Sequence, residues 1–187
     1  MIPVKSTPIK IIALWSFAFA YLFIFYRSVQ SPETNAVKQG LNYLEQLKPE
    51  AALIKFNAAL ALNPNNTLAQ LNKARIYRMR RDWRQVIIES NKTIAIEYFA
   101  PDAYGFRGEA YLIEHRLSPA LADFNRAINQ SLGYPTDPYY NRAKLYYMMN
   151  APQKAAQDII TAKRINLKLR PPFTLRGDPH FTYDWRQ

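Results

Sequence analysis

Apolar residues recur three and four positions apart along most of the chain between residues 33 and 167, the spacing that places them on one face of an α-helix. Proline, asparagine and serine interrupt this pattern at short intervals, where turns are expected. The pattern therefore predicts eight helices joined by short turns, at about residues 33–46, 49–62, 67–80, 83–97, 102–115, 119–131, 138–149 and 153–166.

The pattern itself repeats with a period of about 34 residues. Small residues recur at Gly40, Ala74, Gly108 and Ala143, and three positions after each comes a tyrosine, at Tyr43, Tyr77, Tyr111 and Tyr146. Later positions in the same register hold Ala52, Val86, Ala120 and Ala155, then Phe56, Ser90, Phe124 and Ile159, then Ala59, Thr93, Ala127 and Ala162. Antiparallel helices approach closely only where facing side chains are small, and large side chains then fill the gaps between repeats. Each repeat is therefore expected to be a helical hairpin that stacks on its neighbours.

This signature resembles that of the tetratricopeptide-repeat (TPR) family across about residues 33–167. The resemblance implies an all-α TPR solenoid of four helix-turn-helix repeats. The second repeat departs most from the family pattern, because Ser90 and Thr93 replace the expected aromatic residue and alanine. Turn residues agree with the repeat boundaries: residues 63–66 close the first repeat, while Ser118-Pro119 and Asp137-Pro138 are each interpreted as an N-cap followed by a proline.

Residues 1–30 are predicted to form an N-terminal transmembrane anchor. From Ile11 to Tyr26 every residue except Ser16 is apolar or aromatic, and extending the run to residues 9–26 brings it close to the length needed to span a bilayer. The alternatives are a signal peptide, suggested by the Ala-x-Ala pattern ending at Ala20, and a buried helix. Basic residues before the run favour a single-pass protein with its N-terminus inside and the repeats on the opposite side.

The chain has a formal net charge of +11, which favours an anionic partner such as lipid headgroups, an acidic protein or nucleic acid. It contains no cysteine, so thiolate metal sites, disulfides and cysteine nucleophiles are excluded. Because it has only two histidines, a metal site built on imidazole groups is not expected. No glycine-rich phosphate loop and no nucleophile-base spacing is found. We therefore expect no enzyme activity, no catalytic residues, no metal and no cofactor.

The family resemblance also implies a partner-binding groove, since in TPR proteins the first helices of successive repeats line a concave surface. Transferred by repeat position, the groove would contain Leu71, Asn72, Arg75, Arg78, Phe106, Glu109, Leu112, Tyr140, Asn141, Lys144 and Tyr147. Aromatic, amide and cationic side chains suit an extended partner segment of some acidic character. The alternative is that several of these residues only pack against the fold or are solvated.

A basic segment extends from Lys73 to Arg84 and contains six basic residues and one acidic residue, Asp82. Besides Arg75 and Arg78, the basic residues are Lys73, Arg80, Arg81 and Arg84. The segment is either a solvated helix end or an electropositive contact for an acidic subunit or membrane headgroups. Nucleic acid is the less favoured partner, because no recognised nucleic-acid motif is present.

Residues 168–187 are expected to form an extended, aromatic and basic C-terminal tail, since Pro171-Pro172 ends the helical pattern. Aromatic residues alternate with polar ones near its end, and the predicted tail contacts are Phe173, Phe181, Tyr183 and Trp185. The tail either covers the last repeat, docks on a partner or is disordered.

Together these features predict a non-catalytic scaffold for protein-protein interaction, an accessory or assembly subunit of a membrane protein complex. Its partners would be the other subunits of that complex, together with the lipid bilayer through residues 9–26. Two alternatives remain: a transient assembly factor or chaperone, and a basic-patch binder of anionic lipid or nucleic acid.

Overall fold

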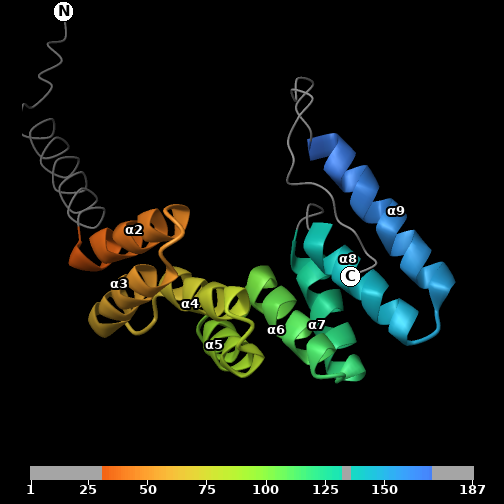
Figure 1. Ribbon diagram of the computed structural model, residues 1–187, viewed down its shortest axis with the longest axis horizontal. Coiled ribbons are helices and arrows are strands. Elements are labelled where there is room, and N and C mark those ends of the chain that lie inside the picture. The colour runs from red at the N-terminus through yellow and green to blue at the C-terminus, as the bar shows by residue number, and fades with distance from the viewer. Residues whose placement is uncertain (1–30, 132–135, 170–187) are drawn as a thin grey trace, which may run out of the picture. The chain divides into compact units, whose positions relative to one another are not determined.

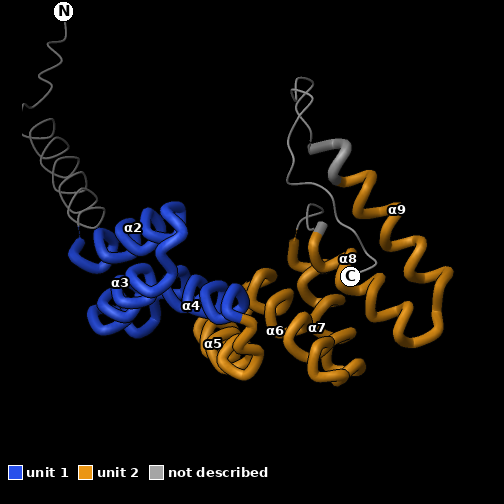
Figure 2. The backbone as a smooth tube through the Cα atoms, viewed as in Figure 1, with its two compact units in different colours: residues 1–80 blue, residues 81–187 orange. Residues whose placement is uncertain are grey.

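The computed structural model describes residues 31–131 and 136–169, and divides the chain between Arg80 and Arg81 into two compact units (Figures 1 and 2). The predicted anchor at 1–30 and the tail contacts beyond residue 169 lie outside the described residues. Within the described ranges, no helix is long and apolar enough to cross a membrane.

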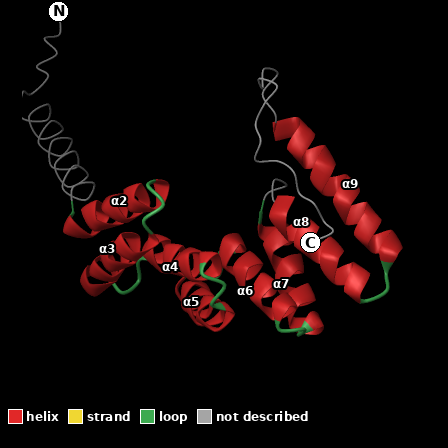
Figure 3. Ribbon diagram, viewed as in Figure 1, coloured by secondary structure: helices red, strands yellow, loops and turns green. Residues whose placement is uncertain are grey.

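Every described element is a helix, as Figure 3 shows for residues 31–131 and 136–169. The first unit contains α2 (Pro32–Glu45), α3 (Pro49–Leu62) and α4 (Thr67–Met79). The second contains α5 (Trp83–Ile96), α6 (Pro101–Ile113), α7 (Leu117–Gln130), α8 (Thr136–Met148) and α9 (Pro152–Leu169). These bounds agree with the predicted helices to within three residues, so the all-helical prediction is confirmed for this part of the chain.

The helices begin at residues that satisfy free backbone donors or fix the backbone for a helix. Asn66 accepts a hydrogen bond from the Ala69 backbone N–H at 2.8 Å, which confirms the turn at residues 63–66. The prediction for Ser118 was wrong, because α7 already begins at Leu117 and its N-cap is Arg116. Asp137 likewise lies inside the first turn of α8 instead of capping it.

In three hairpins the turn between the two helices is closed by a tyrosine carbonyl. The backbone N–H of Lys48 donates to the Tyr43 carbonyl at 2.8 Å, and Arg116 and Ala151 donate to Tyr111 and Tyr146 at the same distance. This six-residue closure is the Schellman arrangement, and it requires a left-handed residue just before the donor. That position has a φ of 55–57° in three turns and is occupied by Leu47, His115 and Asn150.

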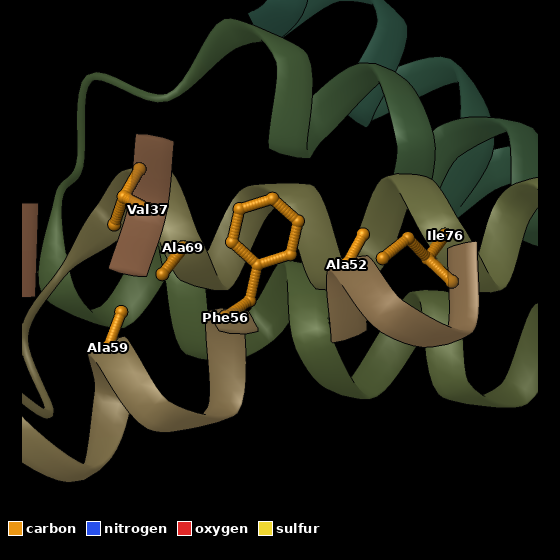
Figure 4. Packing of buried hydrophobic residues seen from close by; sticks show 6 residues of the cluster. All are labelled: Val37, Ala52, Phe56, Ala59, Ala69 and Ile76. Carbon is orange, nitrogen blue, oxygen red and sulfur yellow. The ribbon is translucent and has the colours of Figure 1, made fainter. Parts of the chain in front are cut away.

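The core of the first unit surrounds Phe56, which is fully buried (Figure 4). It packs with Val37, Ala52, Ala59, Ala69 and Ile76. Gly40 on α2 lies directly against the phenylalanine ring: a Cβ atom at this glycine would be only 2.6 Å from Cε1 of Phe56. The small residue that opens the repeat therefore provides the space that the aromatic ring fills.

The second unit repeats this arrangement in its hairpin of α6 and α7. A Cβ at Gly108 would be 2.8 Å from Cε1 of the fully buried Phe124, which belongs to a cluster with Leu112, Ala120 and Leu145. The predicted register of small and large residues is thus confirmed in both hairpins.

Candidate partner-binding surface

Helices α6 and α8 lie next to each other in the second unit and carry most of the predicted groove residues. They approach at Gly105, where an added Cβ would be 3.9 Å from Cγ of Pro138. The side chains that they leave accessible define what we call the α6/α8 surface. Lys144 is exposed, Tyr147 is 55% exposed, and the half-buried members are Phe106, Glu109, Tyr140 and Asn141.

Helical spacing explains why these residues share a surface. Phe106 and Glu109 are three positions apart on α6, and Asn141, Lys144 and Tyr147 are three positions apart on α8. The surface combines two tyrosines, a phenylalanine, an amide and one charge of each sign. Aromatic residues of this kind supply much of the contact energy in protein interfaces, while the amide and the charges orient the bound chain.

Leu112 does not belong to this surface, which corrects its predicted placement. It is only 3% exposed and packs with Phe124 and Leu145 in the core of the second unit. Leu112 lies three residues beyond Glu109, but its apolar side chain is placed in the seam between helices instead of the accessible face.

Four predicted groove residues lie on α4 in the first unit. Arg75 is exposed, while Leu71 and Arg78 are half-buried. Asn72 is only 4% exposed, and its Nδ2 donates to the Leu68 carbonyl at 2.8 Å. The placement of Asn72 in a groove is therefore corrected as well, because its amide is used within the helix.

The basic segment is partly neutralised within the fold. Arg80 forms an ion pair with Glu50 at the start of α3, and its guanidinium carbon lies 5.6 Å from the centre of the Tyr77 ring. Lys73 is half-buried, whereas Arg81 and Arg84, which open the second unit, are exposed. The charge available to a partner is therefore smaller than the sequence count suggests.

Two ion pairs that the sequence analysis missed, each between a half-buried arginine and a buried aspartate, hold the second unit together. Arg107 donates from Nε and Nη2 to both carboxylate oxygens of Asp123, each at 2.7 Å, and from Nη1 to Asn91 at 2.6 Å. One repeat later, Arg142 binds Asp158 at 2.8 Å through both bonds and Asn125 at 2.6 Å. Each arginine thus joins both helices of its own hairpin to the second helix of the preceding repeat.

The hydrogen bonds that Arg107 donates to Asp123 raise the pKa of Arg107 above its ordinary value despite desolvation, and the bonds that Arg142 donates to Asp158 do the same for Arg142. A raised pKa means that the stability gained from each guanidinium is present at all pH values below the ordinary arginine pKa, and is lost only as pH rises through the folded value. The sequence signal was available: both arginines precede their aspartates by 16 residues, and the two pairs are one repeat apart.

An exposed aromatic pair follows α5 in the second unit. Tyr98 is 65% exposed and Phe99 is 54% exposed. The Tyr98 ring packs edge-on against Tyr104, and Arg126 lies 5.1 Å and 5.4 Å from the centres of the Tyr98 and Tyr104 rings. A hydrogen bond to the Tyr104 hydroxyl raises the pKa of Arg126. This cluster is a second place where an aromatic surface is accessible.

The described part of the chain contains no group of three or more histidine, aspartate or glutamate residues placed to hold a metal ion.

Helix α9, the second helix of the last repeat, exposes Gln153, Gln157 and Arg164 beside Ile160. A mostly polar outer face is typical of a terminal repeat. The prediction that the tail covers the last repeat concerns residues outside the described ranges.

Solved structures of TPR proteins share this fold. A segment of MamA from Desulfovibrio magneticus RS-1 aligns with a TM-score of 0.64 and 15% identity, covering 83% of this chain and 88% of that one. A thermophilic TPR protein from Thermus thermophilus aligns with a TM-score of 0.62 and 21% identity, covering 71% and 74%. A TPR protein from Parabacteroides merdae aligns with a TM-score of 0.60 and 17% identity, covering 73% and 54%.

No family model and no curated protein matches the sequence. At these low identities the structural likeness establishes a TPR-like helical fold and nothing further about ligands or partners.

Proposed function

We propose that this protein is a non-catalytic scaffold for protein-protein interaction, and that it serves as an accessory or assembly subunit of a membrane protein complex. The observation that carries the proposal is the α6/α8 surface, where Phe106, Tyr140 and Tyr147 remain accessible on adjoining helices. A TPR-like fold supports it, because stacked hairpins create extended surfaces suited to other chains.

The proposed partner is a protein segment with apolar side chains and some acidic residues. Tyr147 and Phe106 offer apolar contact area, and Lys144 is exposed beside them. An acidic residue of the partner near Lys144 would fix its register, while the aromatic contacts would provide most of the affinity.

The membrane part of the proposal rests on residues 9–26, whose apolar run comes close to the length that a single spanning helix needs. The anchor would keep the repeats beside the complex. Resistance of the full chain to carbonate extraction from membranes would support the anchor, and release into the soluble fraction would contradict it. Protease added to right-side-out vesicles should digest the repeats if the N-terminus lies inside.

The binding role is tested by purifying the full chain from its native membranes in mild detergent. We expect one set of proteins to co-purify at fixed stoichiometry, and the double variant Lys144→Glu with Tyr147→Ala to lose most of them. The matched control is Gln153→Ala with Gln157→Ala, which changes exposed residues of α9. If the unmodified chain, the double variant and the control all retained the co-purifying proteins equally, the proposal would be contradicted. Co-purification at less than a fixed stoichiometry would favour the transient assembly factor.

A further inference from the structure

Helix α3 carries apolar residues on an exposed outer face as well as on its buried inner face, and its polar residues are Glu50, Lys55 and Asn57. Its inner face packs Ala52, Phe56 and Ala59 into the core. Its outer face leaves Ile54 67% exposed and Leu62 59% exposed, and Ala58 and Ala61 between them are also exposed. The four residues are spaced by four, three and one positions, so they form one stripe along the helix. A contiguous exposed apolar patch is typical of an interaction surface.

The other repeats show that this outer stripe is not a requirement of the fold. The positions equivalent to Ile54, Ala58 and Ala61 are Ile88, Lys92 and Ala95 on α5, Ala122, Arg126 and Asn129 on α7, and Gln157, Thr161 and Arg164 on α9. Each of those helices places a cation on the stripe, whereas α3 places none. The apolar outer face therefore belongs to the first repeat specifically.

The chain enters the fold beside the end of this stripe. Helix α2 begins after its N-cap Ser31, and the carboxylate of Glu33 in its first turn accepts hydrogen bonds from Asn63 at 2.9 Å and from Asn66. The start of α2 is thereby tied to the turn between α3 and α4, which is drawn as a loop in Figure 3. Leu62 and Leu68 lie on either side of that turn, and Leu68 is 49% exposed.

Along α3 and α4 this end of the first unit is uncharged, and the one charge that α2 brings to the turn is the Glu33 carboxylate already described. No charged residue occurs from Phe56 to Asn72, a stretch of 17 residues that includes the end of α3, the whole turn and the first part of α4. The opposite end of α3 is different, because Lys48 and Glu50 lie there and Arg80 pairs with Glu50. Only five residues separate Tyr26, the last residue of the apolar run, from Pro32, a reach of at most about 22 Å when fully extended.

We propose that the outer face of α3 and the α3–α4 turn contact the lipid bilayer that takes up residues 9–26, with Ala58, Ala61, Leu62 and Leu68 at the headgroup and acyl boundary. This inference rests on the proposed membrane anchor. A lipid surface fits better than a protein partner, because an uncharged face without aromatic or arginine residues lacks the groups that dominate protein interfaces. It fits the bilayer interface because apolar faces of surface helices bury there.

The test uses single cysteines, which are practical because the natural sequence contains none. Ala58→Cys and Leu62→Cys are labelled with an environment-sensitive fluorophore in the full chain and reconstituted into vesicles of mixed neutral and anionic phospholipid. The matched controls are Leu47→Cys, in the turn that precedes α3 and 79% exposed, and Ala122→Cys, the α7 equivalent of Ile54.

We expect blue-shifted emission at positions 58 and 62, and quenching by lipids carrying a nitroxide near the headgroup that is several-fold stronger than at positions 47 and 122. Water-like emission at positions 58 and 62 would overturn the inference. Blue-shifted emission without lipid quenching would also overturn it, in favour of a protein cover such as residues 1–30 or a second copy.

Flotation of the same vesicles distinguishes a failure of the membrane anchor from a failure of the lipid contact at α3. If the chain floats and resists carbonate while both α3 probes remain in water, the lipid contact is wrong and the anchor stands. If the chain does not float with the vesicles, the anchor and the contact are both wrong.

Discussion

The hairpin of α2 and α3 and the hairpin of α6 and α7 have the same packing and different surfaces. Both fit a glycine against a fully buried phenylalanine, Gly40 with Phe56 and Gly108 with Phe124. Where the second hairpin has the Arg107–Asp123 pair, the first has Gln39 and Lys55 at the equivalent positions. Its outer stripe is apolar, whereas that of α7 carries Arg126. The packing pattern thus defines a hairpin, and the positions outside it distinguish one repeat from another.

The largest expected effect comes from the ion pair that the α6/α7 hairpin has and the α2/α3 hairpin lacks. Asp123→Asn leaves the Arg107 guanidinium, whose side chain is 19% exposed, without its carboxylate, and breaking a buried pair in this way should cost about 3 kcal/mol. Lys55→Gln at the equivalent position of α3 should change the free energy of unfolding by less than about 0.5 kcal/mol. Thermal unfolding of the full chain in detergent measures both, and equal losses would show that the ion pair contributes nothing specific.

A smaller effect should be common to both hairpins. Gly40→Ala and Gly108→Ala each place a Cβ within 3 Å of a phenylalanine ring, and overpacking of this kind should cost about 1–3 kcal/mol. Adding Phe124→Ile to Gly108→Ala should recover part of the loss, because an alanine and an isoleucine occupy these positions in the last repeat, at Ala143 and Ile159.

The matched control is Gly105→Ala in the same helix as Gly108. Its nearest neighbour, Cγ of Pro138, would be 3.9 Å away, so the new methyl group fits. An alanine that fits inside a helix should stabilise the fold by about 0.5–1 kcal/mol. If Gly108→Ala were also stabilising, the close contact with Phe124 would be absent.

A further modest effect concerns the turns inside the hairpins. Leu47 and His115 adopt left-handed backbone angles, which cost a residue with a Cβ about 1–2 kcal/mol. Leu47→Gly and His115→Gly should therefore each raise stability by about 1 kcal/mol, since both side chains are exposed. Asn150→Gly should gain less because asparagine tolerates this conformation. A loss of stability on Leu47→Gly in unfolding experiments would contradict this account of the turn.

The helices could be located well from the sequence because the same residue pattern and the same turn positions recur in each repeat. Sequence reasoning failed where a local cue competed with the turn geometry: Ser118-Pro119 looked like a helix start, but the left-handed residue His115 lets α7 begin at Leu117. It also failed to separate accessible from buried residues on one helix, as Leu112 and Asn72 show, since helical spacing does not say which neighbour covers a face. The arginine-aspartate pairs were missed because helical spacing pairs only charges three or four residues apart, whereas these partners are 16 residues apart.

The most direct test of the proposed scaffold is site-specific photo-crosslinking in native membranes. A photoreactive amino acid replaces Tyr147 on the α6/α8 surface, and in a second variant it replaces Gln157, which is exposed on α9. We predict that position 147 crosslinks to one partner protein in high yield, that position 157 does not, and that Lys144→Glu lowers the yield at position 147. Equal yields at the two positions, or a yield at position 147 that Lys144→Glu leaves unchanged, would contradict the account.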